Sequence, residues 1–494
     1  MKQSQRIVKN AVFGIGGSLI GGLVYLATVL MIAHSVSVRE FGKYSFVLAL
    51  AMFVSNVADS GLPRMLIREV AKDHEGYVSV AGATFSLIWV ISGAMCLLVC
   101  LLVPLFRLDT DVKIAAIIMS VATLADFHSS GYGAVLRAFE DYELDRLGYV
   151  LHKLFLLGSI FLSLRLRLGL VGLVSAHLLA NLLVWKYSQF LVERLYARIP
   201  LYFNVSLWRE LIVSSLPLGA GSMLRSLSLQ LDVLVLSWLT NLTTVGLFSG
   251  PYRISVALRI IPQTLSLPLF PLFSRTAHLS QARFAEVYRL SLKFFLLISM
   301  PLGAFFAAWS GPILLTALGN KYRPAIPAMQ LLGIGLVPFF VSPLFQYVFA
   351  ALDQQRRFFV STCVSFTLRL ILLFVLIPIF GFVGPALAFL CTETAIVMIW
   401  TVQLRRLGYP AGLFNLIWRP IVAAGCMCIV LYLTDSSNMF VRGGMAAIAF
   451  VVYVSALFVL RTFSSEELHH AREGIAFISP FIDSWSKKLR RTDG

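Results

Sequence analysis

Long apolar stretches recur along the whole chain, and they constrain its fold more than any other feature. Of the 494 residues, 58% are hydrophobic and only 13% are charged, whereas ordinary soluble domains carry about 25% charged residues. A run of roughly 18 apolar residues can cross a hydrocarbon core about 30 Å thick, and a helix satisfies its own backbone hydrogen bonds there. The sequence therefore predicts an all-α polytopic membrane protein.

Fourteen transmembrane helices are predicted, one for each separable apolar run. They lie near 11–35, 43–63, 79–106, 112–137, 147–165, 168–192, 210–239, 243–273, 290–318, 325–352, 357–380, 382–403, 414–434 and 441–461. The first run is too long for a signal peptide and lacks a small-residue cleavage site, so we expect it to be the first span. Basic residues concentrate in the connectors on the same side as the amino terminus, which places both termini in the cytoplasm.

The net charge of +17 is explained by these basic connectors, so we expect no nucleic-acid partner. The six cysteines lie within apolar runs and show no metal-binding spacing. The glycines of the first span are not followed by the lysine of a phosphate loop. We therefore expect no metal and no cofactor.

A short motif occurs twice in the chain. Phe41-Gly42-Lys43-Tyr44-Ser45 and Val245-Gly246-Leu247-Phe248-Ser249 share glycine, an aromatic residue and serine in register, and Ala138-Phe139-Glu140 similarly matches Ala351-Leu352-Asp353. The displacement covers six predicted spans, which preserves their orientation. Parallel repeats of this kind are typical of transporters. The sequence thus predicts two parallel six-helix bundles around a central cavity, with the repeated motif as the same outer turn in each.

The repeat divides the chain into four predicted parts. These are an N-terminal bundle (1–207), a C-terminal bundle (208–404), two extra transmembrane helices (405–461) and a cytoplasmic amphipathic, basic tail (462–494). The tail could bind anionic headgroups of the membrane lipid, or its charge could serve orientation alone.

Together with this architecture, the FGxYS turn, GLPRMLIRE (61–69) and VLRAFEDYELD (135–145) resemble the Wzx-like polysaccharide flippases. These belong to the multidrug/oligosaccharidyl-lipid/polysaccharide (MOP) exporter superfamily. The resemblance implies a flippase that moves a polyisoprenyl-pyrophosphate-linked oligosaccharide from the inner to the outer leaflet of the bacterial inner membrane by alternating access. The product would serve O-antigen, capsule or exopolysaccharide assembly, with a polymerase and glycosyltransferases as partners.

Arginines inside or at the ends of spans are the predicted pyrophosphate-binding residues. A charge within a span is costly and should face a cavity or a partner, and guanidinium groups bind phosphate oxygens in bidentate fashion. The candidates are Arg225, Arg259, Arg253, Arg64, Arg68, Arg369 and Arg137. For Arg253 and Arg137, a position at the membrane interface without a binding role is the alternative.

Carboxylates in the spans are candidates for ion coupling. They are Asp232, Asp59, Asp126 and Glu393. The span at 210–239 brings Ser215, Ser222, Arg225, Ser226 and Asp232 onto one helical face. Arg225 and Asp232 lie about 10.5 Å apart along the axis, so each needs a partner on another helix, water or substrate. Arg369 and Glu393 could instead be structural partners of one another. Pro262, Pro268 and Pro271 predict a bent span at 243–273.

Other functions remain to be weighed against the flippase. A multidrug or cation antiporter of the same superfamily would need buried carboxylates, whereas arginines predominate here, and a lipid II flippase would use the same chemistry as the first reading. A membrane glycosyltransferase or polymerase would need acidic or histidine residues in a sizeable outer loop, and the predicted outer connectors are short. The sequence therefore predicts a transporter and not an enzyme.

Overall fold

The computed structural model describes residues 3–463 except 60, 74–75, 106–107, 267 and 434–438. It does not describe the side chains of residues 3–13, 15, 58–59, 105, 214–219 and 439–440. Residues 464–494, which make up nearly all of the predicted basic tail, lie outside the described part.

The described chain is helical throughout. The first half forms α1 (Gln3–Ser35), α2 (Val38–Asp59), α3 (Leu62–Lys72), α4 (Tyr77–Leu102), α5 (Thr110–Ala138), α6 (Tyr142–Arg165) and α7 (Gly169–Leu195). The second half forms α8 (Val205–Leu239), α9 (Leu242–Ala257), α10 (Ile260–Ser266), α11 (Leu269–Leu279), α12 (Gln281–Ala308), α13 (Ser310–Leu318), α14 (Ile326–Ala351), α15 (Gln355–Phe380) and α16 (Gly384–Arg406). Two further helices follow, α17 (Leu413–Tyr432) and α18 (Met439–Val459), and short 3-10 turns occur at Val103–Leu105, Asn320–Ala325 and Gly381–Val383.

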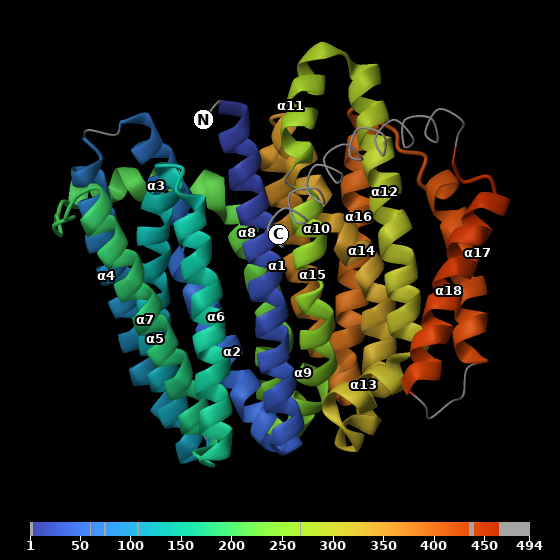
Figure 1. The fold of residues 1–494 in the computed structure, drawn as a ribbon, viewed down its shortest axis with the longest axis horizontal. Helices are drawn as coiled ribbons and strands as arrows, with labels where there is room; N and C mark the ends of the chain where they lie inside the picture. Colours follow the sequence, from blue (N-terminus) through green and yellow to red (C-terminus); the bar gives the residue numbers. More distant parts are fainter. Residues whose placement is uncertain are drawn as a thin grey trace, which may run out of the picture.

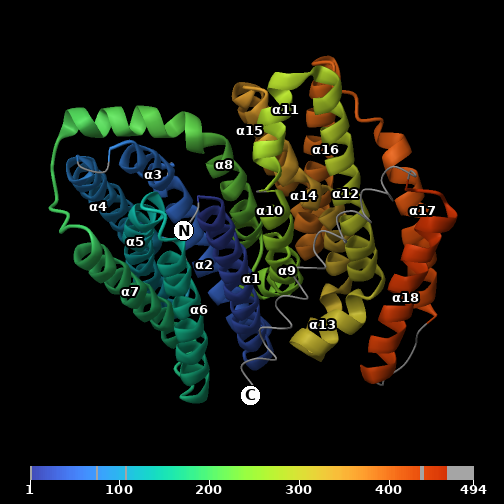
Figure 2. The same ribbon diagram turned by 45° about the horizontal axis from the view of Figure 1, so that its top comes forward.

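The long helices run side by side, with α2 to α7 on one side of Figure 1 and α11 to α18 on the other. Helix α8 joins the two groups. Its first turns run across one end of the first group, and the rest enters the second group (Figure 2). Trp208 fixes this crossing, because its Nε1 donates to the carbonyl of Ala83 on α4 at 3.1 Å.

Within the described residues, ten helices are long and apolar enough to cross a membrane, or up to twelve if each of two bent pairs counts as one span. The predicted fourteen exceeds this count for two reasons. The stretch Gln355–Arg406 is counted once although it holds both α15 and α16, and α8 falls outside the count. Each predicted span nevertheless coincides with a helix or a bent set of helices.

The two bent pairs lie in both halves. Helices α2 and α3 meet at 41°, next to Gly61 with φ 87°, and the α9–α10 segment meets α11 at 45°. The second bend confirms the one expected from the prolines of span 243–273. A Pro ring cannot continue the helical hydrogen-bond ladder, and Pro268 lies directly before the first residue of α11.

The repeated motif explains how the halves touch. Gly42 and Gly246 lie in the first turns of α2 and α9, which cross each other there. A Cβ on Gly42 would lie 1.7 Å from the carbonyl oxygen of Leu242, and one on Gly246 would lie 2.0 Å from that of Val38. Only glycine permits so close a backbone approach. The two copies of the motif therefore form one symmetric crossing between the halves.

A second pair of matched segments also shares its geometry. Glu140 after α5 and Asp353 after α14 both have positive φ, 65° and 54°. The backbone amide of the next residue donates a hydrogen bond back to the helix in both cases. Asp141 N donates to the carbonyl of Leu136 at 2.9 Å, and Gln354 N donates to the carbonyl of Phe349 at 2.8 Å. The two matched segments thus end their helices with the same turn, which also ends α6 at Arg167 and α18 at Arg461.

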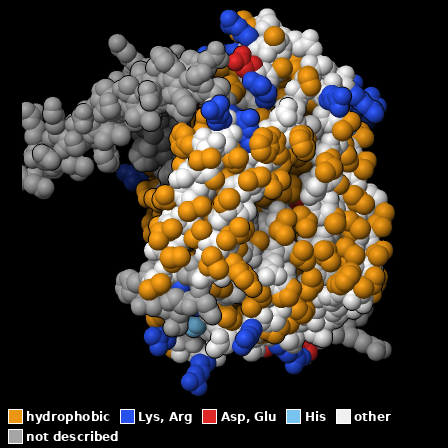
Figure 3. All heavy atoms as spheres, turned by 90° about the vertical axis from the view of Figure 1, so that its right-hand side faces the viewer, with side chains coloured by type: hydrophobic (Ala, Val, Ile, Leu, Met, Phe, Trp, Pro, Cys, Tyr) orange, Lys and Arg blue, Asp and Glu red, His pale blue; other side chains and the backbone are white. Residues whose placement is uncertain are grey.

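Helices α17 and α18 pack on the second half through α12. Two hydrogen bonds from partly or fully buried side chains hold them: Trp309 Nε1 donates to the carbonyl of Leu431 at 3.0 Å, and Tyr453 Oη donates to that of Leu297 at 3.0 Å. Their outer face forms an apolar belt whose upper and lower edges carry basic side chains (Figure 3). This pattern suits a protein surrounded by lipid.

Candidate functional site

Three of the predicted arginines meet around one cavity of about 180 Å³. Helix α8 supplies Ser222, Arg225 and Ser226, the face expected from the sequence. The other residues that line it are Arg64 on α3, Arg259 and Gln263 at the start of α10, Phe339, Ser342, Pro343, Gln346 and Tyr347 on α14, Phe358 on α15 and Trp400 on α16. We call this space the arginine cavity. It combines residues of the second half with α3 of the first.

Arg225 is held in place by a buried ion network behind the cavity. Its guanidinium donates to Ser342 Oγ at 2.7 Å and also to the carboxylate of Glu393 on α16. Arg369 on α15 in turn contacts Glu393 at 3.4 Å and Asp232 through its Nε at 2.9 Å. Two arginines and two carboxylates balance in charge, which is how a buried charge becomes tolerable.

Arg259 lies at the break between α9 and α10. The backbone turns there, and the amide of Arg259 donates a hydrogen bond to the carbonyl of Val256 at 3.0 Å. With the Gln263 amide oriented so that its oxygen faces the arginine, that oxygen accepts from Arg259 Nε at 2.8 Å. No ion pair joins Arg259 to a described carboxylate. Its guanidinium therefore forms no ion pair within the described part of the chain and faces the cavity.

The lining of the arginine cavity is basic and aromatic. Among the described residues around it there are three arginines and no aspartate or glutamate. Phe358 and Trp400 stack with ring centroids 5.1 Å apart, and Arg225 lies over the ring of Phe339 at 5.9 Å. Guanidinium groups that converge without a carboxylate favour an anion with several oxygens, and aromatic faces suit the flat side of a ring.

The remaining predicted arginines lie elsewhere. Arg369 is buried in the ion network and contacts Glu393, as the structural alternative expected. Arg253 reaches across the α2–α9 crossing to the carbonyl of Ser45 at 3.5 Å. Arg68 is exposed and pairs with Glu69 at 2.8 Å, and Arg137 pairs with Asp145 at 2.7 Å. These four side chains do not line the arginine cavity.

The candidates for ion coupling divide in a similar way. Asp232 and Glu393 are fully buried in the network behind the cavity, and the side chain of Asp59 lies outside the described residues. Asp126 lines a second, polar hollow of about 220 Å³ between α5, α6 and α7, together with Ser130 and Arg137 of α5. No group of metal-ligating side chains occurs among the described residues.

Several lining residues had no signal in the sequence. Gln346 donates to Ser222 Oγ at 3.0 Å, and Tyr347, Phe358 and Trp400 close the cavity on the side of α14 to α16. In a chain with 38 Phe, 16 Tyr and 8 Trp, nothing distinguishes these aromatic residues before the helices are packed.

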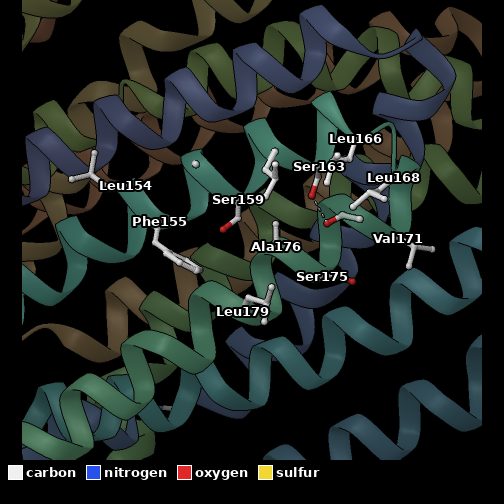
Figure 4. Close-up of a pocket in the computed structure, with 13 residues that line it drawn as sticks. Leu154, Phe155, Ser159, Ser163, Leu166, Leu168, Val171, Ser175, Ala176 and Leu179 are labelled. Carbon is white, nitrogen blue, oxygen red and sulfur yellow. Dashed lines mark hydrogen bonds between the residues drawn. The ribbon is translucent and has the colours of Figure 1, made fainter.

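A larger hollow of about 830 Å³ lies between α6 and α7 (Figure 4). Its lining is made of leucines and small residues, and Ser163 within it donates to the carbonyl of Gly172 at 3.1 Å. Because no charged side chain lines this hollow, it offers nothing to a phosphate group. The arginine cavity is therefore the candidate site despite its smaller volume.

A protein-family model described as "Polysaccharide biosynthesis protein" matches residues 7–277, more than half of the chain. The chain belongs to this family. The resemblance read from the sequence is thereby confirmed. A comparison with curated proteins gave no match.

Solved structures show how this polysaccharide biosynthesis protein folds. The lipid II flippase MurJ in an inward closed conformation is similar with a TM-score of 0.74 at 15% identity, covering 91% of this chain and 98% of that chain. An inward-facing multidrug resistance MATE family transporter of the MOP superfamily is similar with a TM-score of 0.63 at 16% identity, covering 81% of this chain and 94% of that chain. A MOP superfamily transporter from Pyrococcus furiosus, described with a binding pocket of reverse polarity, has a TM-score of 0.57 at 15% identity. This match covers 81% of this chain and 95% of that chain.

At these identities the likeness concerns the fold. The family member described here therefore has the MOP superfamily fold. It is an all-helical, multi-pass membrane protein of the polysaccharide biosynthesis family, with a fold like those of MurJ and the MATE transporters.

Proposed function

We propose that the protein flips a polyisoprenyl-pyrophosphate-linked oligosaccharide from the inner to the outer leaflet of the bacterial inner membrane. The observation that supports this most strongly is the arginine cavity, where Arg64, Arg225 and Arg259 converge without a carboxylate in the described lining. A diphosphate presents several anionic oxygens, which guanidinium groups bind in bidentate fashion while remaining protonated. The family's role in polysaccharide biosynthesis supports a sugar-bearing cargo.

The residues divide the work in this proposal. Arg259 lines the cavity and forms no ion pair with a described carboxylate, so it binds the diphosphate directly. Arg225 binds it while anchored to Ser342 and Glu393, which fix the direction of its guanidinium. Arg64 approaches from α3 of the first half, so that the anion bridges both halves. Phe358 and Trp400 stack on each other at the wall of the cavity, where they would border the first sugar.

Alternating access fits the size of the cavity. Its volume of about 180 Å³ is below the roughly 300–1,000 Å³ of pockets for drug-sized ligands, so it holds a headgroup fragment and must widen for the oligosaccharide. The break at Leu258–Arg259 and the 45° bend before α11 lie beside the site, where helices interrupted near a substrate supply flexible joints. The α2–α9 crossing closes the halves at the opposite end of α9.

The charge of the substrate distinguishes the alternative transport functions. A cation or multidrug antiporter would bring a positively charged substrate to a cavity of three arginines, which is unfavourable. A lipid II flippase remains a second candidate because lipid II is also a diphosphate, and MurJ shares the fold. Both termini in the cytoplasm, as the basic connectors predict, would place the tail beside the glycosyltransferases that build the cargo, with a polymerase acting outside.

Deletion of the gene should abolish surface polysaccharide and leave drug sensitivity unchanged. The physical reason is that the cargo's charged headgroup cannot cross the bilayer unaided. Surface glycan is measured by gel electrophoresis or sugar-specific labelling, with plasmid complementation as the control. Increased drug sensitivity with normal glycan would favour the antiporter, and lysis that a known lipid II flippase relieves would favour lipid II.

A further inference from the structure

A second basic hollow, which shares no lining residue with the arginine cavity, lies at the seam between α12 and the last two helices. Its volume is about 490 Å³. The residues that line it are Arg289, Leu290 and Lys293 on α12, Asn415, Leu416, Trp418 and Arg419 on α17, and Arg461, Thr462 and Phe463 just after α18. We call it the basic seam. It holds four cationic side chains and, among its described lining residues, no carboxylate.

Two of these cationic side chains form hydrogen bonds with backbone carbonyls of the protein. Arg419 Nη1 donates to the carbonyl of Arg461 at 2.5 Å, and Lys293 Nζ donates to that of Thr462 at 2.7 Å. Both bonds satisfy carbonyls of the short segment that follows α18. For Arg419 this contact accounts for one donor of its guanidinium.

The remaining donors point to a missing anion. Arg419 Nε is buried without a hydrogen-bond partner in the described part of the chain, and such a group costs free energy unless something binds it. The side chains of Arg289 and Arg461 form no hydrogen bond or ion pair with described residues. The three arginines gathered at this helix seam repel one another unless a counter-ion joins them.

The depth and surroundings of the basic seam identify the anion. Asn415 and Arg419 lie in the first two turns of α17, so the hollow is at the end of a span and not at its centre. Leu290 and Trp418 are exposed beside it, and the apolar belt of this face continues below (Figure 3). Tryptophan and arginine at a span end mark the level of lipid headgroups.

From this geometry we infer that the basic seam binds the headgroup of an anionic phospholipid. The phosphodiester oxygens accept hydrogen bonds from Arg289, Arg419 and Arg461, and the acyl chains lie along Leu290 and Leu416. Basic pockets between transmembrane helices bind acidic headgroups in this way. A free phosphate would gain the charge contacts but not the apolar ones. The bound lipid would join α17 and α18 to α12, the helix on which they pack.

The test uses the purified full-length protein and native mass spectrometry with phosphatidylglycerol, phosphatidylcholine or inorganic phosphate. The double variant Arg289→Gln/Arg461→Gln removes two charges without removing a described bond. At about 1 kcal/mol for each basic residue, its affinity for phosphatidylglycerol should fall roughly 30-fold. The matched control, Arg275→Gln/Arg283→Gln, removes two exposed charges of α11 and α12 outside the basic seam and should bind like wild type.

Retention of phosphatidylglycerol over phosphatidylcholine by wild type and the control, and its loss in the double variant, would support the inference. Equal binding of both lipids, or an equal loss in the control, would overturn it. Displacement of phosphatidylglycerol by an equal concentration of inorganic phosphate would show a phosphate site instead and would also overturn it. None of these outcomes depends on flipping, so the proposed function is tested separately.

Discussion

Replacing Arg259 with glutamine should reduce polysaccharide at the cell surface by roughly ten- to hundredfold while the protein stays in the membrane. Arg259 lies at the arginine cavity without a described carboxylate partner, so its charge is available to the cargo. A hydrogen bond to a charged group contributes about 1.5–3 kcal/mol, which sets this range of fold-change. Surface glycan is quantified in a deletion strain that carries the variant on a plasmid.

Two further variants make this result specific. Arg259→Lys keeps a positive charge but loses the bidentate geometry, so it should retain partial export. Arg275→Gln on α11 removes an exposed arginine far from the cavity lining and should export normally. Normal glycan with Arg259→Gln at wild-type protein levels would exclude Arg259 from cargo binding.

Replacing Arg369 with methionine should destabilise the protein by about 3–5 kcal/mol, the largest stability effect expected for a single substitution here. Arg369 and Asp232 are almost completely buried, and the change leaves the Asp232 carboxylate without its ion pair. An uncompensated buried charge causes a loss of this size. Unfolding is followed by fluorescence-detected size-exclusion chromatography of heated, detergent-purified protein.

The double variant Arg369→Met/Asp232→Leu separates charge from packing. Replacing both partners with apolar residues of similar volume is often nearly neutral, so most of the stability should return. Glu393 keeps Arg225 as its partner in this variant. A double variant as unstable as Arg369→Met alone would show that packing, and not charge compensation, dominates at this position.

Helical periodicity predicted much of the cavity but not its partners. It placed Ser222, Arg225 and Ser226 on one face of α8 and showed that Arg225 and Asp232 could not pair with each other. Their partners, Glu393 and Arg369, come from α16 and α15. Which helix faces which depends on packing between segments more than a hundred residues apart in the chain, so one sequence alone cannot choose them.

The arginines of span 243–273 illustrate the same limit. Arg253 and Arg259 are six residues apart and were both expected at the cavity. The helical path is broken at Leu258, and Arg253 above that break faces α2 while Arg259 lines the cavity. Prolines predicted the bend, but not the exact residue where the helix is interrupted.

The repeated motif was recognised from its letters, yet its purpose required the structure. Matching glycines indicated equivalent turns in two bundles. The contact between Gly42 and the carbonyl of Leu242, and between Gly246 and that of Val38, shows that the copies touch each other. The repeat in the sequence predicted that the two copies are equivalent. Whether they touch depends on how closely the two halves approach each other, which the sequence does not show.

Binding of a polyisoprenyl diphosphate to the purified protein would test the arginine cavity most directly. By native mass spectrometry, wild type should bind the diphosphate at least tenfold more tightly than the corresponding monophosphate, because more oxygens reach the guanidinium groups. Arg259→Gln should lose this preference, and the basic-seam variant Arg289→Gln/Arg461→Gln should keep it. Equal affinity of wild type and Arg259→Gln for the diphosphate would contradict a diphosphate site at the arginine cavity.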